Sequence, residues 1–280
     1  MLNDAGLRPK KTFGQNFLVS ETVAREIAAT CVPMREWGRA RVIEIGAGTG
    51  ALTRWLAERS QSLCAIERDR ELVPLLVREF GAVPCVRVVE EDAKNVDLIG
   101  LLGPRDERSP RVLCGNLPYA ITGPLLRRAT ECAQHLERVV FMVQDEVAER
   151  LRASPATKDY GALTVFVRAV FDVKRIRRVG AAAFFPPPAV TSAVVELLPL
   201  EQAHAAETPT FRALVHGAFS ARRKTLRNAW TGLARDVDSL VRAAAEARVD
   251  LSARGETLDV QDFAQMAAAI DADVNPNVAR

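Results

Sequence analysis

The segment Asn116-Leu117-Pro118-Tyr119 carries groups that could bind the exocyclic amine of a nucleobase. It follows an apolar run, residues 111–115, that predicts a buried strand, and open α/β sheets place their chemistry at the carboxyl ends of such strands. The Asn116 amide oxygen and the neighbouring carbonyls can accept N–H groups, and the Tyr119 ring offers a flat surface for a base. Taken alone, the segment is explained about as well by an ordinary strand-to-loop exit, because Asn and Pro are common in turns.

A glycine-rich turn supplies a second set of candidate binding residues. Gly46, Gly48 and Gly50 follow a predicted strand over 41–45, and glycine lets a ligand approach the backbone closely. Glu67 lies 21 residues after Gly46, at the end of the next predicted strand, where a carboxylate can accept ribose hydroxyl protons. Asp92 follows the third strand and could accept a hydrogen bond from an adenine amino group.

Two adenosine-containing cofactors fit such a turn. Gly46, Gly48 and Ala51 satisfy the dinucleotide pattern G-x-G-x-x-G/A, so a nicotinamide enzyme is one interpretation. Glu44, two residues before the first glycine, instead matches the E/D-x-G-x-G-x-G loop of methyltransferases. The turn lacks a nearby basic residue for a pyrophosphate, and the fourth strand ends in an amine-binding segment. We therefore expect S-adenosylmethionine as the cofactor.

Composition limits the classes of protein that remain. The 280 residues are 48% hydrophobic and 26% charged, as in ordinary soluble proteins, with no apolar run near the ~18 residues of a membrane span. Five cysteines without Cys-x-x-Cys spacing predict a reducing, cytoplasmic location, and three scattered histidines predict no metal site. The net charge is only +3, but basic residues gather at 8–11, 174–178 and 222–227, which could together contact phosphates.

The order of predicted elements indicates an α/β fold. Helical segments alternate with predicted strands up to residue 143, which favours a parallel sheet covered on both sides. Two β-rich segments around residues 184–188 predict an antiparallel hairpin that closes the sheet. After about residue 208 the chain is helical and rich in Ala and Arg, so we expect a boundary near 200 between domains 1–200 and 201–280. The predicted strands are 41–45, 63–66, 85–89, 111–114 and 139–143.

Five motifs in this order give the chain a family resemblance. They occupy residues 10–18, 159–163, 184–195, 221–228 and 256–263. Together with the segments above, they resemble the small-subunit rRNA adenine N6,N6-dimethyltransferases over the whole chain. The resemblance implies a Rossmann-like class I methyltransferase sheet with a small all-helical C-terminal domain, which would contact the rRNA. It also implies dimethylation of two adjacent adenines during maturation of the small ribosomal subunit.

The resemblance assigns roles to individual positions. It implies cofactor contacts from Asn16, Leu18, Gly46, Gly48, Glu67, Asp92 and Asn116. The catalytic positions it implies are Asn116, Leu117, Pro118, Tyr119 and Phe184. The Asn116 oxygen and the Leu117 carbonyl would accept the amine hydrogens, Pro118 would stiffen the backbone, and Tyr119 and Phe184 would stack on the two faces of the base. An alternative for the second face is that Phe184 belongs to the core and Phe185 meets the base.

Four positions depart from the family pattern. Ala156-Thr157 precede Lys158 where Gly-Ser is common, Ala162 replaces a frequent arginine, and Ala189 replaces the usual lysine. These departures lie in segments expected to face RNA, so they bear on affinity rather than on chemistry.

Other functions remain open at this point. A large-subunit rRNA adenine methyltransferase of the macrolide-resistance type would share the fold, cofactor and chemistry, although those enzymes usually carry Ile at the position of Leu117. An adenine-specific DNA methyltransferase fits less well, because its segment usually has two prolines. A binding factor for immature small subunits, active without catalysis, is a further alternative. We expect a monomer by default, with rRNA of an immature small subunit as the partner and neither membrane nor metal.

Overall fold

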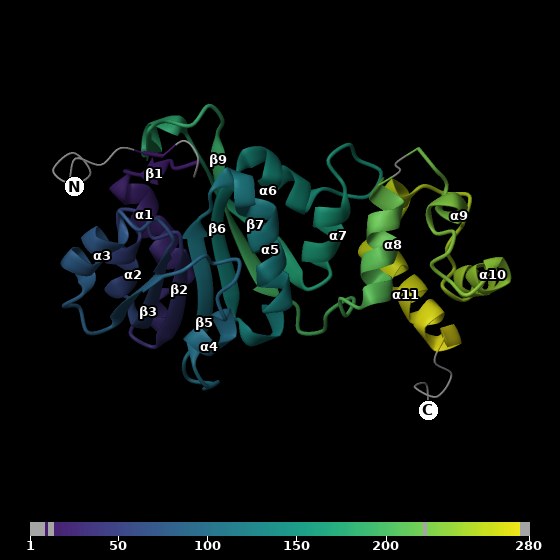
Figure 1. Ribbon diagram of the computed structural model, residues 1–280, viewed down its shortest axis with the longest axis horizontal. Coiled ribbons are helices and arrows are strands. Elements are labelled where there is room, and N and C mark those ends of the chain that lie inside the picture. Colours follow the sequence, from purple (N-terminus) through teal and green to yellow (C-terminus); the bar gives the residue numbers. More distant parts are fainter. Residues whose placement is uncertain (1–8, 11–13, 221–222, 275–280) are drawn as a thin grey trace. The chain divides into compact units, whose positions relative to one another are not determined.

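The computed structural model describes residues 9–10, 14–220 and 223–274, and the chain forms two compact units (Figure 1). The first unit contains Met1–Ala148 and Asp172–Pro199, and the second contains Glu149–Phe171 and Leu200–Arg280. The sequence-based boundary near 200 coincides with the end of the first unit. Residues 149–171, which that expectation placed in the first domain, belong to the second unit because their apolar side chains pack with the C-terminal helices.

A seven-stranded sheet forms the centre of the first unit, in the order β4-β3-β2-β5-β6-β9-β7. The pairs from β4 to β6 are parallel, and β9 runs antiparallel to β6. This arrangement confirms the predicted α/β class and the closing of the sheet by β7 and β9. The strands are β2 Ala40–Ile45, β3 Ser60–Glu67, β4 Val86–Glu90, β5 Arg111–Asn116, β6 Arg138–Gln144, β7 Phe171–Val179 and β9 Ser192–Pro199.

Local sequence sets the helix boundaries in this unit. The Ser20 hydroxyl accepts a hydrogen bond from Val23 N at 3.4 Å and so caps α1. Pro74 lies in the first turn of α3, where the missing N–H of proline costs no hydrogen bond, so the helix begins at Val73. The helices are α1 Glu21–Cys31, α2 Thr53–Ala57, α3 Val73–Phe80, α4 Leu98–Leu102, α5 Thr122–Glu131 and α6 Asp145–Arg152, the last containing the boundary between the units.

A short ladder joins distant parts of the first unit. Strand β1, Phe17–Leu18, pairs antiparallel with β8, Phe184–Phe185. Phe17 lies opposite Phe185 and Leu18 lies opposite Phe184. The N-terminal segment is thereby fixed to the connection between β7 and β9.

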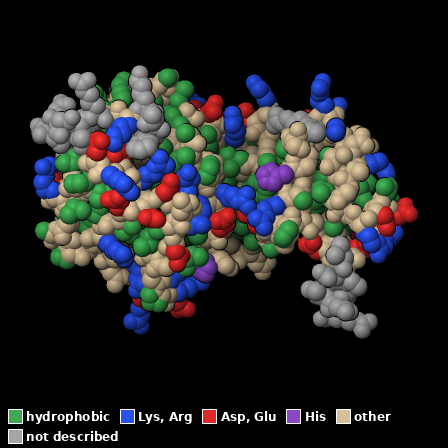
Figure 2. Space-filling view, in the orientation of Figure 1, with side chains coloured by type: hydrophobic (Ala, Val, Ile, Leu, Met, Phe, Trp, Pro, Cys, Tyr) green, Lys and Arg blue, Asp and Glu red, His purple; other side chains and the backbone are tan. Residues whose placement is uncertain are grey.

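The basic run on β7 is largely engaged in ion pairs within the first unit. Arg178 Nη2 lies 2.6 Å from Asp145 Oδ2, Arg175 lies 3.7 Å from the other Asp145 oxygen, and Arg177 pairs with Glu26. Figure 2 shows acidic and basic side chains interspersed on the face in view. Carboxylates of the same unit therefore neutralise part of the charge that this run contributes to the predicted phosphate-binding surface.

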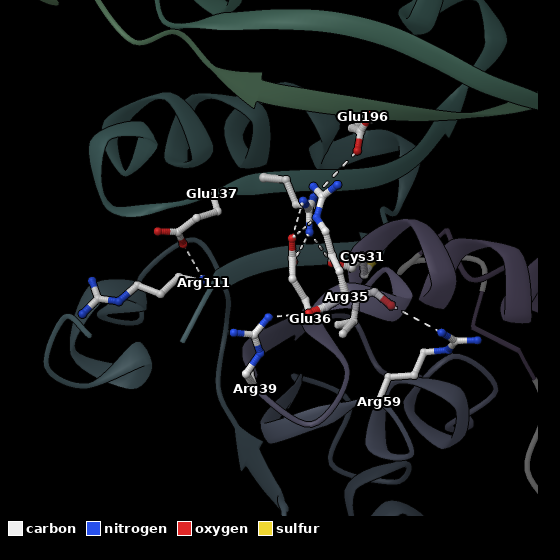
Figure 3. Close-up of polar contacts among 10 residues, drawn as sticks. Cys31, Arg35, Glu36, Arg39, Arg59, Arg111, Glu137 and Glu196 are labelled. Carbon is white, nitrogen blue, oxygen red and sulfur yellow. Dashed lines mark hydrogen bonds and ion pairs between the residues drawn. The ribbon is translucent and has the colours of Figure 1, made fainter. Parts of the chain in front are cut away.

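A buried ion pair lies where β6 begins (Figure 3). The Arg138 guanidinium contacts Glu36 Oε2 at 2.5 Å and the Cys31 carbonyl at 3.0 Å, and Glu196 on β9 lies 3.8 Å from its Nε. Burial alone would raise the pKa of Glu36, but the hydrogen bonds and charge of Arg138 hold that pKa below its usual value. The pair connects the turn after α1 to two strands of the sheet.

The second unit is helical and has its own apolar core. Trp230 is fully buried, donates its indole N–H to the Leu214 carbonyl at 2.9 Å and meets Phe263 edge-on at 6.2 Å between ring centroids. Ala156, at one of the departures from the family pattern, has a φ of +64°, a region that favours glycine. The helices are α7 Ala162–Arg168, α8 Pro209–Ser220, α9 Leu226–Ala229, α10 Val237–Glu246 and α11 Val260–Val274.

No helix in the described part of the chain is both long and apolar enough to cross a membrane. Within the same residues, no three His, Cys, Asp or Glu side chains are grouped so that they could hold a metal ion.

Candidate active site

A pocket opens at the carboxyl ends of the central parallel strands, with about 960 Å³ of empty space that is partly open to solvent. Its wall consists of residues 14–17, 45, 46, 48, 66–68, 91–93 and 116–121. Neighbouring parallel strands end at the same edge, which brings residues far apart in the sequence together. The predicted site residues that line it are Asn16, Gly46, Gly48, Glu67, Asp92, Asn116, Leu117, Pro118 and Tyr119.

The glycine turn bends sharply at the pocket floor. Gly46 and Gly48 have φ of +71° and +59°, values that other residues adopt only with strain. A Cβ on Gly48 would lie 3.2 Å from the Phe17 ring, so glycine also leaves room for the N-terminal segment. The Gly48 N–H donates to Glu67 Oε2 at 2.8 Å, which ties the turn to β3.

The Glu67 carboxylate is strongly hydrogen-bonded to backbone. Besides Gly48 N on Oε2, its Oε1 accepts from Arg68 N at 2.9 Å and Asp69 N at 2.8 Å. Burial raises the pKa of Glu67 above its usual value, and the three N–H groups limit that rise. These bonds occupy three of about four acceptor positions, so the Glu67 side chain has about one left for a ligand hydroxyl.

Asp92 presents an ionised acceptor at the pocket wall. Its Oδ1 accepts from Lys94 N at 3.0 Å, and its Oδ2 lies 3.0 Å from Arg68 Nη1 and 3.5 Å from Lys94 Nζ. Partial burial, which would raise the pKa of Asp92, is outweighed by the Lys94 and Arg68 interactions, and the pKa lies below its usual value. The carboxylate can therefore accept an N–H at neutral pH.

Glu44, by contrast, does not line the pocket. It is buried on β2 beneath the turn, and its Oε2 accepts from Thr53 Oγ1 at 2.6 Å at the start of α2. Burial raises the pKa of Glu44 to about 8, and the nearby Glu67 charge adds to the rise. Glu44 is therefore mainly protonated at neutral pH and links the strand to the helix.

The Asn116 amide has a defined orientation at the end of β5. Its Nδ2 donates to the Asn16 carbonyl at 2.9 Å, and a carbonyl can only accept, so the nitrogen end of the amide must face Asn16. The amide oxygen is left to accept from another group in the pocket. The residue before Asn116 is Gly115, and a Cβ at that position would lie only 2.3 Å from the Ile45 carbonyl oxygen, so the close approach of the two strands requires glycine.

The rest of the tetrapeptide is held by the next strands of the sheet. Leu117 N donates to the Met142 carbonyl at 3.0 Å, and Pro118 begins a short 3-10 turn, Tyr119–Ile121. The Tyr119 hydroxyl lies 2.8 Å from Ser192 Oγ on β9, which fixes the far end of the ring. An acceptor and an aromatic ring are thus both anchored beside the turn that Glu67 holds.

Comparison with known proteins identifies the family. The sequence model of the ribosomal RNA adenine dimethylases matches residues 6–271. The chain belongs to the ribosomal RNA adenine dimethylase family. Proteins named ribosomal RNA small subunit methyltransferase A from Geobacter metallireducens and Anaeromyxobacter sp. (strain K) are 42% and 41% identical to it. Each alignment covers 95% of this chain, and 96% and 95% of the respective relative.

Solved structures agree on the fold of this dimethylase. A dimethyladenosine transferase from Plasmodium falciparum matches with a TM-score of 0.70 at 22% identity, covering 89% of this chain and 95% of the other. The 23S rRNA methyltransferase ErmE matches with a TM-score of 0.64 at 24% identity, covering 91% and 100%. At these identities, both likenesses establish the fold alone.

Two of the residues assigned through the family lie outside the pocket. Leu18 and Phe184 are 5% and 4% exposed and pack together in the core against α1. Since successive residues of a strand point to opposite faces, the inward position of Phe184 turns Phe185 outward, where it is 51% exposed. The structure therefore favours the alternative in which Phe185, rather than Phe184, is available to a ligand.

Sequence reasoning gave no role to Asp69 or Gln15 of this dimethylase. Gln15 lines the pocket, and its Nε2 donates to Asp69 Oδ2 at 2.8 Å. Gln15 lies inside the N-terminal motif, which is the only sequence signal for it. The Asp69 side chain is nearly fully buried although it follows a strand in a charged stretch, so its sequence context predicts a surface residue.

Proposed function

We propose that this dimethylase transfers methyl groups from S-adenosylmethionine to N6 of adenines in small-subunit rRNA, giving N6,N6-dimethyladenosine at two adjacent adenines. The observation that carries the proposal is the Asn116 amide, whose nitrogen is bound by Asn16 so that its oxygen is left as an acceptor in the pocket. The names of the curated relatives support the small subunit as target. The large-subunit alternative has support only at the level of the fold.

The residues around the glycine turn fit the proposed cofactor. Gly46 and Gly48 leave room for its methionine part, Glu67 keeps an acceptor for a ribose hydroxyl, and ionised Asp92 suits the adenine amino group. When bound, S-adenosylmethionine supplies a methyl group made electrophilic by the positive sulfur. The protein's part is to bind and orient both reactants.

The tetrapeptide would make the adenine amine reactive. The N6 lone pair of adenine is delocalised into the ring, so the nitrogen is a poor nucleophile. Hydrogen bonds from N6 to the Asn116 oxygen and the Leu117 carbonyl would favour a pyramidal nitrogen with its lone pair directed at the methyl group. Stacking on Tyr119 would add on the order of 1–3 kcal/mol of base binding, and in-line positioning would supply the remaining rate gain.

The proposed reaction needs no protein base, because the cationic amine formed by attack is acidic enough to release a proton to water. After the first transfer, N6 keeps one hydrogen. The second round therefore proceeds with one of the two acceptor contacts replaced by a methyl group.

The proposed partner is rRNA in an immature small subunit, bound by a monomer of this chain in the cytoplasm. We propose that the second unit contacts the rRNA, because Arg223, Lys224 and Arg227 are exposed near α9. The paired arginines of β7 are weaker candidates for phosphate contacts.

Transfer of labelled methyl to small subunits that lack the modification tests the proposal. We expect N6,N6-dimethyladenosine in small-subunit rRNA and none in large-subunit RNA run in parallel. Label in the large-subunit RNA would instead support the resistance-type alternative, and no label in any RNA would refute the proposal.

The Asn116→Ala variant tests the catalytic role of the amide. Loss of this acceptor is expected to lower kcat by about 100-fold or more, while binding of the variant to immature subunits stays at the wild-type level. Loss of subunit binding in this variant would contradict a purely chemical role for Asn116.

A further inference from the structure

Asp69 lies at the centre of a hydrogen-bonded cluster to which neither the family resemblance nor the proposed mechanism assigns a role. Its Oδ1 accepts from Lys10 Nζ at 2.8 Å and Glu71 N at 3.1 Å, and its Oδ2 accepts from Gln15 Nε2 at 2.8 Å. Gln15 Oε1 in turn accepts from Lys10 N at 2.8 Å. Both side-chain ends of Gln15 are therefore bonded, each in a direction that its partner dictates.

The cluster holds the residues that cover the pocket. Residues 14–17, here called the N-terminal cover, all line the cavity, and Phe17 packs against Leu72 and Leu75 beside the Gly48 backbone. Asn16, the residue after Gln15, provides the carbonyl that orients the Asn116 amide. A displacement of Gln15 would therefore move the group that fixes the proposed amine acceptor.

Asp69 also contacts the cofactor side of the pocket. The Asp69 N–H donates to Glu67 Oε1 at 2.8 Å, and Glu67 is the residue expected to bind the ribose. Asp69 is therefore bonded both to Glu67 and, through Gln15, to the N-terminal cover. The Asp69 carboxylate is 4% exposed, and water cannot readily replace a partner lost there.

We propose that Asp69 and Gln15 are positioning residues for methyl transfer, which lock the N-terminal cover over the pocket and thereby hold Asn116 in its accepting orientation. This inference rests on the proposed function for its kinetic consequence, but its structural part can be measured without cofactor or RNA.

The directions of the hydrogen bonds allow a reciprocal exchange. In Asp69→Asn, the introduced NH2 group faces the Gln15 NH2 group, so two donors meet and no hydrogen bond forms. Turning the Gln15 amide by 180° would not help, because its NH2 group would then face the Lys10 N–H, which is also a donor. In Gln15→Glu, two carboxylates face each other. In the double variant the introduced amide can donate to the introduced carboxylate, while the bonds from Lys10 and Glu71 keep their acceptors.

The experiment compares both single variants, the double variant and the wild type. Asp250→Asn serves as a matched control, because it removes one carboxylate from an exposed turn of the second unit. Backbone hydrogen exchange of residues 14–18 is measured on the ligand-free proteins. Kinetic constants for S-adenosylmethionine and the midpoint of thermal unfolding are measured alongside.

We expect each single variant to exchange faster at residues 14–18 and to lose about 10- to 100-fold in kcat/KM, with kcat itself reduced, as for one charged hydrogen bond. The double variant should regain slow exchange and most of the activity, and the unfolding midpoints should remain close to that of the wild type. Recovery in the double variant would not follow from a general loss of stability.

Two results would overturn the inference. One is wild-type kcat in single variants whose N-terminal cover exchanges faster, since positioning would then not matter for transfer. The other is a double variant as impaired as its parents in both exchange and activity. An inactive wild type would refute the proposed function instead, and the exchange pattern would still decide whether Asp69 and Gln15 lock the cover.

Discussion

Replacing Glu44 by glutamine should stabilise the protein at neutral pH. The pKa of Glu44 is raised from 4.5 to about 8 by burial, so at pH 7 the folded protein holds a proton that the unfolded chain has released. Stability from this group is complete below pH 4.5 and is lost as pH rises toward 8. Holding the proton at pH 7 costs about 3 kcal/mol. Glutamine is neutral at every pH, and its oxygen can still accept from Thr53 Oγ1.

Denaturant unfolding of wild-type and Glu44→Gln proteins between pH 4 and pH 9 measures this effect. The advantage of the variant should be near zero at pH 4, grow by about 1.4 kcal/mol per pH unit above 4.5 and level off near pH 8. If the difference in unfolding free energy between the two proteins stayed constant with pH, Glu44 would not be protonated in the folded protein. A variant less stable than the wild type at pH 7 would also contradict this protonation.

The structure supports three further predictions. Phe184→Ala should cost about 3–5 kcal/mol of unfolding free energy, because Phe184 is buried. Phe185→Ala should leave stability nearly unchanged and lower the rate of methyl transfer about tenfold, because Phe185 is exposed. Denaturant unfolding and a methyl-transfer assay would separate the two effects. Arg138→Met should cost about 3–5 kcal/mol because the buried Glu36 carboxylate loses its buried partner and keeps only the exposed Arg35. Adding Glu36→Gln should restore part of this stability, and an unchanged unfolding midpoint in the single variant would contradict the prediction. Ala156→Gly should raise the free energy of unfolding by about 1 kcal/mol, because glycine adopts a φ of +64° without strain. A loss of stability in this variant would contradict the prediction.

Much of the site could be predicted from the sequence because parallel strands impose it. The parallel strands lie in the order β4-β3-β2-β5, so the residues at their carboxyl ends share one edge of the sheet. Glu67, Asp92 and Asn116 therefore lie around one pocket, although 24 or more residues separate them along the chain. Local chemistry was equally readable at the Ser20 cap and at Pro74.

What the sequence could not reveal depends on partners distant in the chain. Whether Phe184 or Phe185 points inward is decided by pairing with Phe17 and Leu18, since a shift of one residue exchanges the two faces of a strand. Asp69 likewise owes its burial to Gln15 and other residues of the N-terminal segment, more than 50 positions earlier. No local pattern encodes either outcome.

The β1–β8 ladder also has a consequence for the order in which the protein is made. Leu18 is translated 166 residues before its partner Phe184. The strands β2 to β6 can pair before that point, but the ladder that fixes Phe17 and Leu18 cannot form. Closing so long a loop is slow relative to local folding. A nascent chain that ends before residue 184 would thus carry the glycine turn and Asn116 without this anchor for the cover, so completion of the site follows nearly complete translation of the first unit.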